Sequence, residues 1–236
     1  MRDEGAWKPT KFEQRGGVWR GNRDIEQLAR GSRVMADLQA CAYASALAGV
    51  AHGELLDLGA GSVPLYGMYR PYVSGVTCVD WANTAHPSPH LDLDVDLREP
   101  LPFGDASFDT VVATDVLEHM PYPERLFAEI VRLLRPGGVI VVGVPFSYPL
   151  HEEPFDYFRY TEHRLRLFCA DAGVTCEQVF AYGGPSAVML DHAAKALDTV
   201  RPLRVLAGLP ALAARPRRAD ARPTPLPLGY VMVVRN

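Results

Sequence analysis

The stretch LLDLGAGSVPLYG, residues 55–67, decides the fold, because it joins a short apolar run to a glycine turn that precedes a helix. Gly59 and Gly61 allow a sharp turn with the backbone close to a ligand, since glycine has no Cβ. In dinucleotide-binding turns a third glycine stands where this chain has Pro64. Proline has no backbone N–H and a fixed φ, so this turn offers phosphate oxygens one donor fewer. A pyrophosphate ligand is therefore disfavoured.

Two acidic residues near this turn indicate a different nucleoside. Asp57 directly precedes the turn of Gly59, Ala60 and Gly61, and its carboxylate would repel a diphosphate but attract a cation. Asp80 ends the next apolar run, at about the 20-residue spacing expected of a carboxylate that binds ribose hydroxyls, and Trp81 can lie against an adenine ring. Together they favour S-adenosylmethionine, which carries an ammonium and a sulfonium. Alternatively, an aspartate at a strand end serves only as a turn former or helix cap.

Further apolar runs set the fold class. They cover residues 54–59, 75–81, 108–114 and 138–146, and helical patterns separate them. Such an alternation predicts a doubly wound α/β fold, with a parallel sheet covered on both faces. A helix is predicted over 123–135, from Pro123 to the sequence RPGG. The alternating tract HLDLDVDL, 90–97, predicts a half-exposed edge strand.

The two ends of the chain are predicted from composition and periodicity. Residues 1–22 read as an arm, either mobile or folded over a site, and 24–50 as two helices split near Gly31. Thr161 and Gly173 should bound a helix, and 176–182 and the C-terminal segment should be strands. We expect an N-terminal arm and helical cap over 1–50 and a cofactor-binding domain over 51–236. That domain carries a helical insertion at about 186–214, broken at Pro202 and Pro210, and then a loop, RPRRADARPTP, 215–225.

Bulk composition excludes several functions. The 236 residues suffice for one large α/β domain, and 24 basic against 28 acidic residues, a net charge of −4, give no attraction for nucleic acid. No CxxC pair occurs and the aspartates of 90–97 lack a calcium-loop pattern, so no metal is expected. No apolar run has the ~18 residues of a membrane span. We expect a cytoplasmic protein with a small-molecule substrate, with homodimerisation through the helical insertion as one possibility.

Four segments carry a family resemblance: LLDLGAGS, VDW, LPFGDASFDTVVATDVLEHM and LRPGGVIVVGVPF. With them the chain resembles class I S-adenosylmethionine-dependent methyltransferases of the bacterial small-molecule group, from about Glu54 to Val174. The resemblance implies a Rossmann-like, mostly parallel seven-stranded sheet whose last strand enters antiparallel between the two preceding ones. It departs from the family at Val63, where a third glycine is common. The resemblance also implies two sets of cofactor contacts. Asp96 and Leu97 would contact the adenine, and Thr114, Asp115 and Val116 would border the methionine part.

The predicted reaction is methyl transfer to a hydroxyl of a small molecule such as a sugar or natural-product intermediate. It needs alignment of the acceptor with the methyl group and a base for the hydroxyl proton. His119, in VLEHM, and His151, in the loop after 138–146, are the candidate bases. Tyr157 and Tyr160 are predicted to line the acceptor pocket. Alternatively, His119 shapes the cofactor pocket or caps a helix, and the tyrosines only pack the loop.

Two other functions remain open on the sequence. One is an NAD(P)-dependent oxidoreductase, which the GxGxxP turn and the lack of a Tyr-xxx-Lys pair near the predicted site disfavour. The other is a non-methylating or non-catalytic protein that keeps the S-adenosylmethionine fold.

Overall fold

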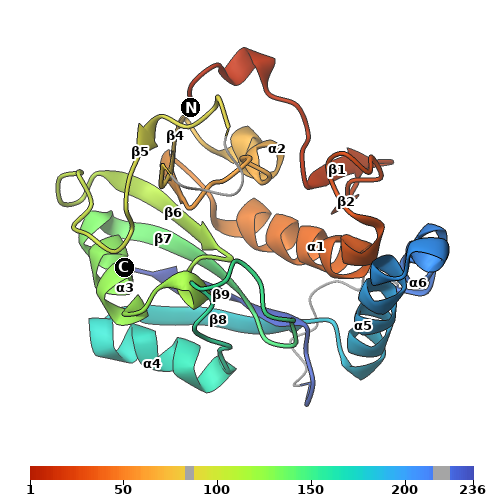
Figure 1. Cartoon of the computed structure of the whole chain (residues 1–236). Helices are drawn as coiled ribbons and strands as arrows, with labels where there is room; N and C mark the ends of the chain where they lie inside the picture. The colour runs from red at the N-terminus through yellow and green to blue at the C-terminus, as the bar shows by residue number, and fades with distance from the viewer. Residues whose placement is uncertain (83–87, 215–223) are drawn as a thin grey trace.

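The computed structural model describes residues 1–82, 88–214 and 224–236, and most of the loop predicted at 215–225 lies outside them. Its main feature is a seven-stranded sheet of order β5-β4-β3-β6-β7-β9-β8 (Figure 1). The strands are β3 (Glu54–Leu58), β4 (Gly75–Asp80), β5 (Leu93–Asp94), β6 (Phe108–Thr114), β7 (Leu134–Pro145), β8 (Thr175–Tyr182) and β9 (Gly229–Arg235). β9 lies antiparallel between β7 and β8, whereas β3 to β7 pair in parallel. The predicted doubly wound sheet with an antiparallel last strand is confirmed.

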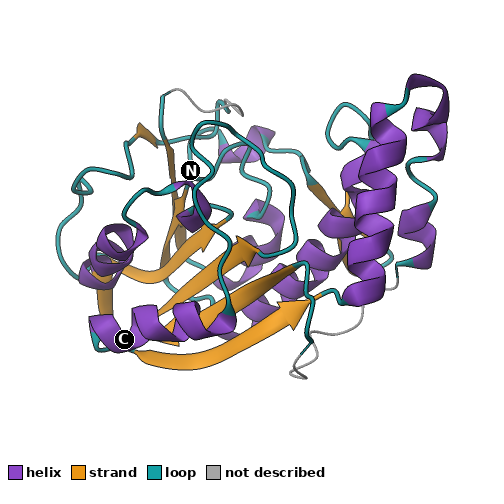
Figure 2. Cartoon of the chain, turned by 60° about the horizontal axis from the view of Figure 1, so that its bottom comes forward, coloured by secondary structure: helices purple, strands orange, loops and turns teal. Residues whose placement is uncertain are grey.

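Helices cover both faces of this sheet (Figure 2). One face carries α1 (Arg33–Val50), α2 (Tyr66–Tyr69) and α5 (Pro185–Thr199), and the other carries α3 (Pro123–Leu133) and α4 (Glu162–Ala172). Neighbouring side chains of a strand alternate between the two cores: Leu55 packs with α1, while Leu56 packs with α3. Each such leucine, when fully buried, contributes about 1.5–3 kcal/mol. The division of the chain at residue 50 stays a prediction, and α1 shares its core with the sheet.

The first 32 residues differ from the expected arm and helix. After a 3-10 turn (η1, Glu4–Ala6), β1 (Phe12–Arg15) and β2 (Val18–Gly21) form an antiparallel hairpin. Turns and a 3-10 helix (η2, Arg30–Ser32) then precede α1, so the predicted helix before Gly31 is wrong. The side chain of Asn22 accepts a hydrogen bond from the backbone N–H of Asp24, and that of Asp24 from Glu26 N–H. Such local bonds compete with helix formation.

The predicted edge strand over 90–97 is shortened to Leu93–Asp94. The carboxylate of Asp92 accepts the backbone N–H of Cys78 at 2.8 Å, in place of a strand-to-strand bond. After the strand, Asp96 accepts the N–H of Arg98, which turns the chain. Side-chain acceptors thus take part in the pairing at both ends of β5, where the N–H groups of Asp92 and Val95 still donate to β4 carbonyls.

The C-terminal half follows the prediction more closely. Thr161 caps α4 by accepting Arg164 N–H, and Gly173 ends it with φ +69°. α3 starts at Pro123 but ends at Leu133, two residues before the predicted end, and the sequence RPGG that follows it lies within β7. A short 3-10 helix, η4 (Leu117–His119), lies between β6 and α3. These elements place the ends of β6 and β7 at the site described below.

The insertion consists of α5, a 3-10 helix (η5, Arg201–Leu206) and α6 (Pro210–Ala213). The predicted breaks at Pro202 and Pro210 are both present, since each proline lies in the first turn of a new helix. Asp191 of α5 accepts the backbone N–H of Met35 in α1, so the insertion packs on its own chain. Within 1–82, 88–214 and 224–236, no helix has the length and apolar character required to cross a bilayer.

Candidate active site

A cavity of about 610 Å³ opens at the carboxyl ends of the parallel strands, where ligands of doubly wound sheets bind. Its volume lies in the range of small-molecule sites. Every residue predicted to bind the cofactor lines it: Asp57, Gly59, Ala60, Gly61, Asp80, Trp81, Asp96, Leu97, Thr114, Asp115 and Val116. The fold therefore brings these residues together from four strand ends, and their individual contacts with the cofactor stay predictions.

The glycine turn has a conformation that glycine is needed to adopt. Gly59 has φ +66°, and a Cβ built on it would lie 2.5 Å from the Val116 side chain. Gly61 N–H donates to one carboxylate oxygen of Asp80 at 2.9 Å, and Trp81 N–H donates to the other at 2.8 Å. The turn after β3 and the carboxylate at the end of β4 thus hold each other in place.

Val63 occupies the position where a third glycine is common in the family. Its φ of +54° lies in the left-handed region, which a β-branched residue rarely adopts. The side chain is fully buried, its N–H donates to the Ala60 carbonyl, and its own carbonyl accepts the Trp7 indole N–H at 3.1 Å. Packing and hydrogen bonds therefore hold this strained residue in the path that glycine would take.

The N-terminal arm lies over this turn. The Thr10 hydroxyl donates to the Ser62 carbonyl at 3.2 Å, and the Lys11 ammonium pairs with Asp115 at 3.2 Å. Lys11 and Phe12 both line the cavity. Of the two alternatives for residues 1–22, the structure has the arm folded over the site.

The cavity is acidic. The carboxylate side chains that line it are Asp57, Asp80, Asp96, Asp115, Glu118, Glu152 and Glu153. Its cationic side chains are Lys11 and Arg98, and both are ion-paired, with Asp115 and with Asp96. An excess of carboxylate over cationic side chains in a partly enclosed cavity favours a cationic ligand and disfavours a diphosphate.

Asp57 lies at the base of the cavity and is 3% exposed. Burial, opposed by the hydrogen bond from the Tyr69 hydroxyl at 2.9 Å and aided by the charge of Asp80, raises the pKa of its carboxyl to about 7. In the ligand-free protein this group is thus partly protonated near neutral pH. A cation bound beside it would favour its ionised form.

The pKa shift of Asp57 predicts a pH dependence of stability. Its value rises from 3.8 to about 7 on folding, so its contribution is fully present below pH 3.8 and is lost as the pH rises through 7. We expect the free energy of unfolding of the ligand-free protein to fall by roughly 2–3 kcal/mol from pH 5 to pH 8 on account of this group. Urea unfolding of the parent and of Asp57→Asn across this range measures it. Equal slopes in the two proteins would contradict the prediction.

His119 and His151 meet at the wall of the cavity, with ring centroids 4.8 Å apart. The Nδ1 of His119 is 2.9 Å from the Phe155 carbonyl, which only accepts, so Nδ1 carries the proton and Nε2 has the lone pair. The Nδ1 of His151 lies 3.2 Å from the Asp156 carboxylate. Burial and the neighbouring His119 lower the pKa of His151. The neutral form of His119 therefore has Nε2 unprotonated, whereas Nδ1 of His151 faces both the Asp156 carboxylate and, at 3.5 Å, the Arg159 guanidinium.

Glu118 is a site residue that the sequence analysis missed. Its side chain is fully buried, and within the described residues neither carboxylate oxygen has a hydrogen-bond partner. Burial, and then the charge of Asp115, raise the pKa of this carboxyl well above its ordinary value. The sequence signal available for Glu118 was its place in VLEHM, where an acidic residue stands between an apolar residue and a histidine. Its isolation comes from the loop 148–159, whose Tyr157 N–H donates to the Glu118 carbonyl.

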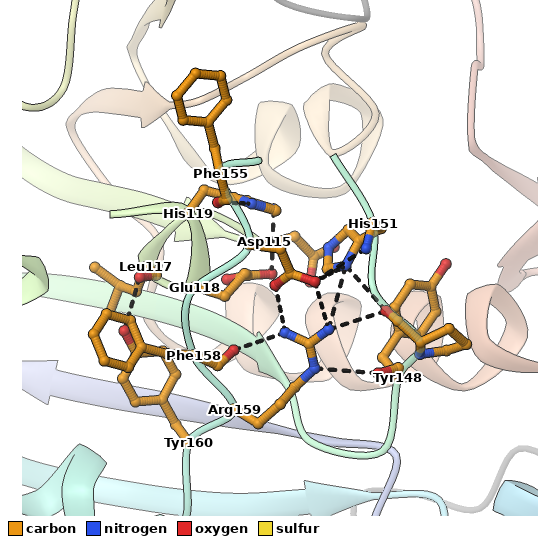
Figure 3. A network of polar contacts seen from close by, with 12 residues as sticks. Asp115, Leu117, Glu118, His119, Tyr148, His151, Phe155, Phe158, Arg159 and Tyr160 are labelled. Atoms are coloured by element: carbon orange, nitrogen blue, oxygen red, sulfur yellow. Dashed lines mark hydrogen bonds and ion pairs between the residues drawn. The ribbon is translucent and has the colours of Figure 1, made fainter. Parts of the chain in front are cut away.

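The prediction for Tyr157 and Tyr160 is not supported. Tyr160 is buried in the core, where its hydroxyl donates to the Leu117 carbonyl at 2.7 Å, and Tyr157 is 45% exposed. Neither lines the cavity, whereas Tyr148 of the same loop does. The loop folds back because Arg159 pairs with Asp156 at 2.6 Å and donates to the Tyr148 carbonyl (Figure 3).

The sheet with its antiparallel β9, and the acidic cavity over a two-glycine turn, are those expected of the class I S-adenosylmethionine-dependent methyltransferase fold, and part of the chain matches a family model for a methyltransferase domain. Residues 56–142 match the family model described as "Methyltransferase domain".

Two curated relatives are a demethylmenaquinone methyltransferase of Renibacterium salmoninarum and the O-methyltransferase cnsE of Penicillium expansum. The first is 35% identical, over 40% of this chain and 38% of the relative. The second is 33% identical, over 44% of this chain and 43% of the relative. The chain thus spans less than half the length of these relatives.

Among solved structures, a methyltransferase from Mesorhizobium loti has a TM-score of 0.54 at 16% identity, over 86% of this chain and 100% of that one. The [4+2]-cyclase SpnF has a TM-score of 0.53 at 19% identity, over 82% of this chain and 79% of the cyclase. These likenesses concern the fold alone.

Proposed function

We propose that the protein transfers a methyl group from S-adenosylmethionine to a hydroxyl of a small molecule. The observation that carries the proposal is the single acidic cavity in which the predicted cofactor residues meet. S-Adenosylmethionine supplies an electrophilic methyl group on a positively charged sulfur. Asp80 would accept the ribose hydroxyls, Asp57 and Asp115 would face the cationic part, and Trp81 would contact the adenine. The acidic lining also disfavours the alternative of an NAD(P)-dependent oxidoreductase.

The acceptor end of the cavity supports oxygen as the methylated atom. His119, His151 and Tyr148 line this end, next to the residues predicted to hold the methionine part. Imidazole side chains at this end suit a hydroxyl that must lose its proton. One relative is named an O-methyltransferase, in line with this proposal. A homodimer and the absence of nucleic-acid partners stay predictions.

The proposal is tested by incubating the protein with S-adenosylmethionine and a panel of hydroxylated metabolites, with S-adenosylhomocysteine and a methylated product measured together. Appearance of both products in equal amounts is the expected result. A protein that binds the cofactor but forms neither product from any acceptor would favour the non-methylating alternative.

Cofactor binding itself has a sharper test at Asp80. We expect Asp80→Ala to weaken binding of S-adenosylhomocysteine at least tenfold, because two ribose hydroxyl bonds to a charged acceptor, each worth about 1.5–3 kcal/mol, are lost. The variant also removes the acceptor of Gly61 N–H and Trp81 N–H. Isothermal titration calorimetry measures the effect.

The matched control for this test is Asp94→Ala. Asp94 pairs in register with Asp80 on the neighbouring strand, but it is exposed and does not line the cavity. The affinity of the Asp94→Ala variant for S-adenosylhomocysteine should stay within about twofold of that of the parent, because a surface charge contributes little. Equal affinities of the two variants would contradict the placement of the ribose.

A further inference from the structure

Glu118, His119 and His151 form a cluster, here called the Glu-His-His cluster, at the acceptor end of the cavity. One ligand atom of each residue lies within 4.8 Å of the others. Figure 3 shows Glu118 and His119 on one side and His151 on the other, with Arg159 below them in that view. The side chain of Glu118 is 0% exposed and that of His119 13%.

The contacts inside the cluster are unfavourable without a cation. Because Nδ1–H of His119 donates to the Phe155 carbonyl, its Nε2 carries the lone pair, and this atom lies 3.9 Å from Glu118 Oε1. This distance is too long for a hydrogen bond. A buried carboxyl group without a hydrogen-bond partner is unfavourable, and the nearby Nε2 lone pair offers it no donor. A positive ion between the two atoms would remove this penalty.

The geometry suits one metal ion. Transition metals bind imidazole nitrogen and carboxylate oxygen at about 2.0–2.2 Å, so two ligand atoms of one ion lie about 3–4 Å apart. The Glu118 to His119 distance of 3.9 Å is within that spacing. The ligand atoms of the three residues lie within 4.8 Å of one another, and a side-chain rotation that shortened this separation by less than 1 Å would bring His151 to the same ion.

Each imidazole is also anchored by its other nitrogen. His119 Nδ1 is fixed by the Phe155 carbonyl at 2.9 Å. His151 Nδ1 lies 3.2 Å from Asp156 Oδ2, and Arg159 holds the Asp156 carboxylate through two contacts. Metal-ligating histidines have such outer partners, which fix the tautomer and orient the ring.

We propose that Glu118, His119 and His151 bind one divalent transition-metal ion, of the Zn²⁺, Mn²⁺ or Fe²⁺ type, and that the acceptor hydroxyl occupies an open position on it. Two imidazoles and a carboxylate are a donor set for these ions rather than for Ca²⁺ or Mg²⁺, which prefer oxygen. Three protein ligands leave positions open toward the cavity.

The ion would give the cluster a role in the proposed methyl transfer. This role rests on the proposed function, whereas the binding of the metal ion does not rest on it. A bound hydroxyl loses its proton near neutral pH, and the proton passes to water at the cavity mouth. The oxygen lone pair then forms the bond to the methyl carbon, while the electron pair of the carbon–sulfur bond stays on sulfur. The substrate class is thus an alcohol or phenol whose oxygen can bind the ion. The histidines act as ligands and not as the final proton acceptor.

Metal binding is tested with Co²⁺ as the probe, on full-length protein stripped by a chelator. Visible absorption reports nitrogen and oxygen ligands, and a near-ultraviolet charge-transfer band would report thiolate ligands. We expect one saturable Co²⁺ site per chain without thiolate bands. Glu118→Gln and His151→Ala should each weaken it at least about tenfold, as for other perturbed metal sites.

Glu153→Gln and His163→Ala are the matched controls, since Glu153 is an exposed carboxylate at the cavity and His163 is exposed outside it. Both should bind Co²⁺ like the parent. His151→Ala keeps the test decisive if Glu118→Gln fails to fold, because the His151 side chain is 24% exposed. Absence of a saturable site, or equal affinity in all four variants, would overturn the proposal.

A second measurement separates this proposal from the proposed function. The chelated protein should still bind S-adenosylhomocysteine, and its methyl transfer should drop at least about tenfold and return on adding Zn²⁺ or Mn²⁺. Full turnover by chelated protein would overturn the metal role but leave the methyltransferase proposal standing. Bound Co²⁺ with no methyl transfer under any condition would overturn the methyltransferase proposal alone.

Discussion

Replacement of both His119 and His151 by alanine is expected to lower kcat for methyl transfer by about 10²- to 10⁴-fold, the range that proton-transfer groups contribute. Both imidazoles lie at the acceptor end of the cavity, and their loss removes the groups that act on the hydroxyl, directly or through a bound ion. The affinity for S-adenosylhomocysteine should change little, since the predicted ribose and adenine contacts come from β4 and the residues after β5. Steady-state kinetics together with calorimetry separate the two effects.

His163→Ala provides the control for this pair. His163 is exposed at the start of α4 and does not line the cavity, so its loss should leave kcat and KM unchanged. If the double variant turned over at the parent's rate, the acceptor would bind away from the two histidines and the placement of the acceptor end would be wrong.

Gly59→Ala is expected to have the second large effect, on the fold as well as on the cofactor. The added methyl group would lie 2.5 Å from Val116 Cγ2, and φ is +66°. The left-handed backbone costs an alanine about 1–2 kcal/mol and overpacking costs about 1–3 kcal/mol. We therefore expect a loss of about 2–5 kcal/mol in the free energy of unfolding. Cofactor affinity should fall as well, because Val116 and Gly59 both line the cavity. Urea unfolding and calorimetry measure the two losses.

Two further variants distinguish the causes of this loss. Gly59→Ala combined with Val116→Ala removes the clash but not the backbone strain, so it should be destabilised less than the sum of the two single variants. Gly104→Ala is the control, because a Cβ there would have only the Ser107 hydroxyl within 4 Å, at 3.5 Å, and φ is not positive. Unchanged stability of Gly59→Ala would show that the turn can rearrange.

The sheet could be predicted from the sequence because its strands are runs of apolar residues that pack on both faces, as in β6 and β7. The hairpin of residues 12–21 was missed, although Gly16 and Gly17 between FEQR and VWRG are a two-residue turn signal. The flanking strands contain charged residues and no apolar alternation. Contact with α1 stabilises them instead, and such a long-range contact cannot be read from a local pattern.

The two ends of the cavity also differed in how far the sequence could predict them. The predicted cofactor residues follow strands directly, so the topology alone brings them to one edge. At the acceptor end, the surroundings of Glu118 and the choice of Tyr148 over Tyr157 depend on the path of the loop 148–159. That path is set by the contacts of Arg159 with Asp156 and with the Tyr148 carbonyl. The absence of cysteine spacing likewise gave no reason to expect a metal site built on a carboxylate and two histidines from separate segments.

The left-handed Val63 has a consequence for how relatives of this chain are recognised. Its backbone angle is that of a glycine, but a buried side chain and the indole of Trp7 maintain it. In this chain the left-handed backbone at the position accordingly depends on packing and on the N-terminal arm, not on glycine. A search pattern that requires glycine here would overlook such chains, whereas one that also accepts a branched residue when an upstream tryptophan is present would retain them.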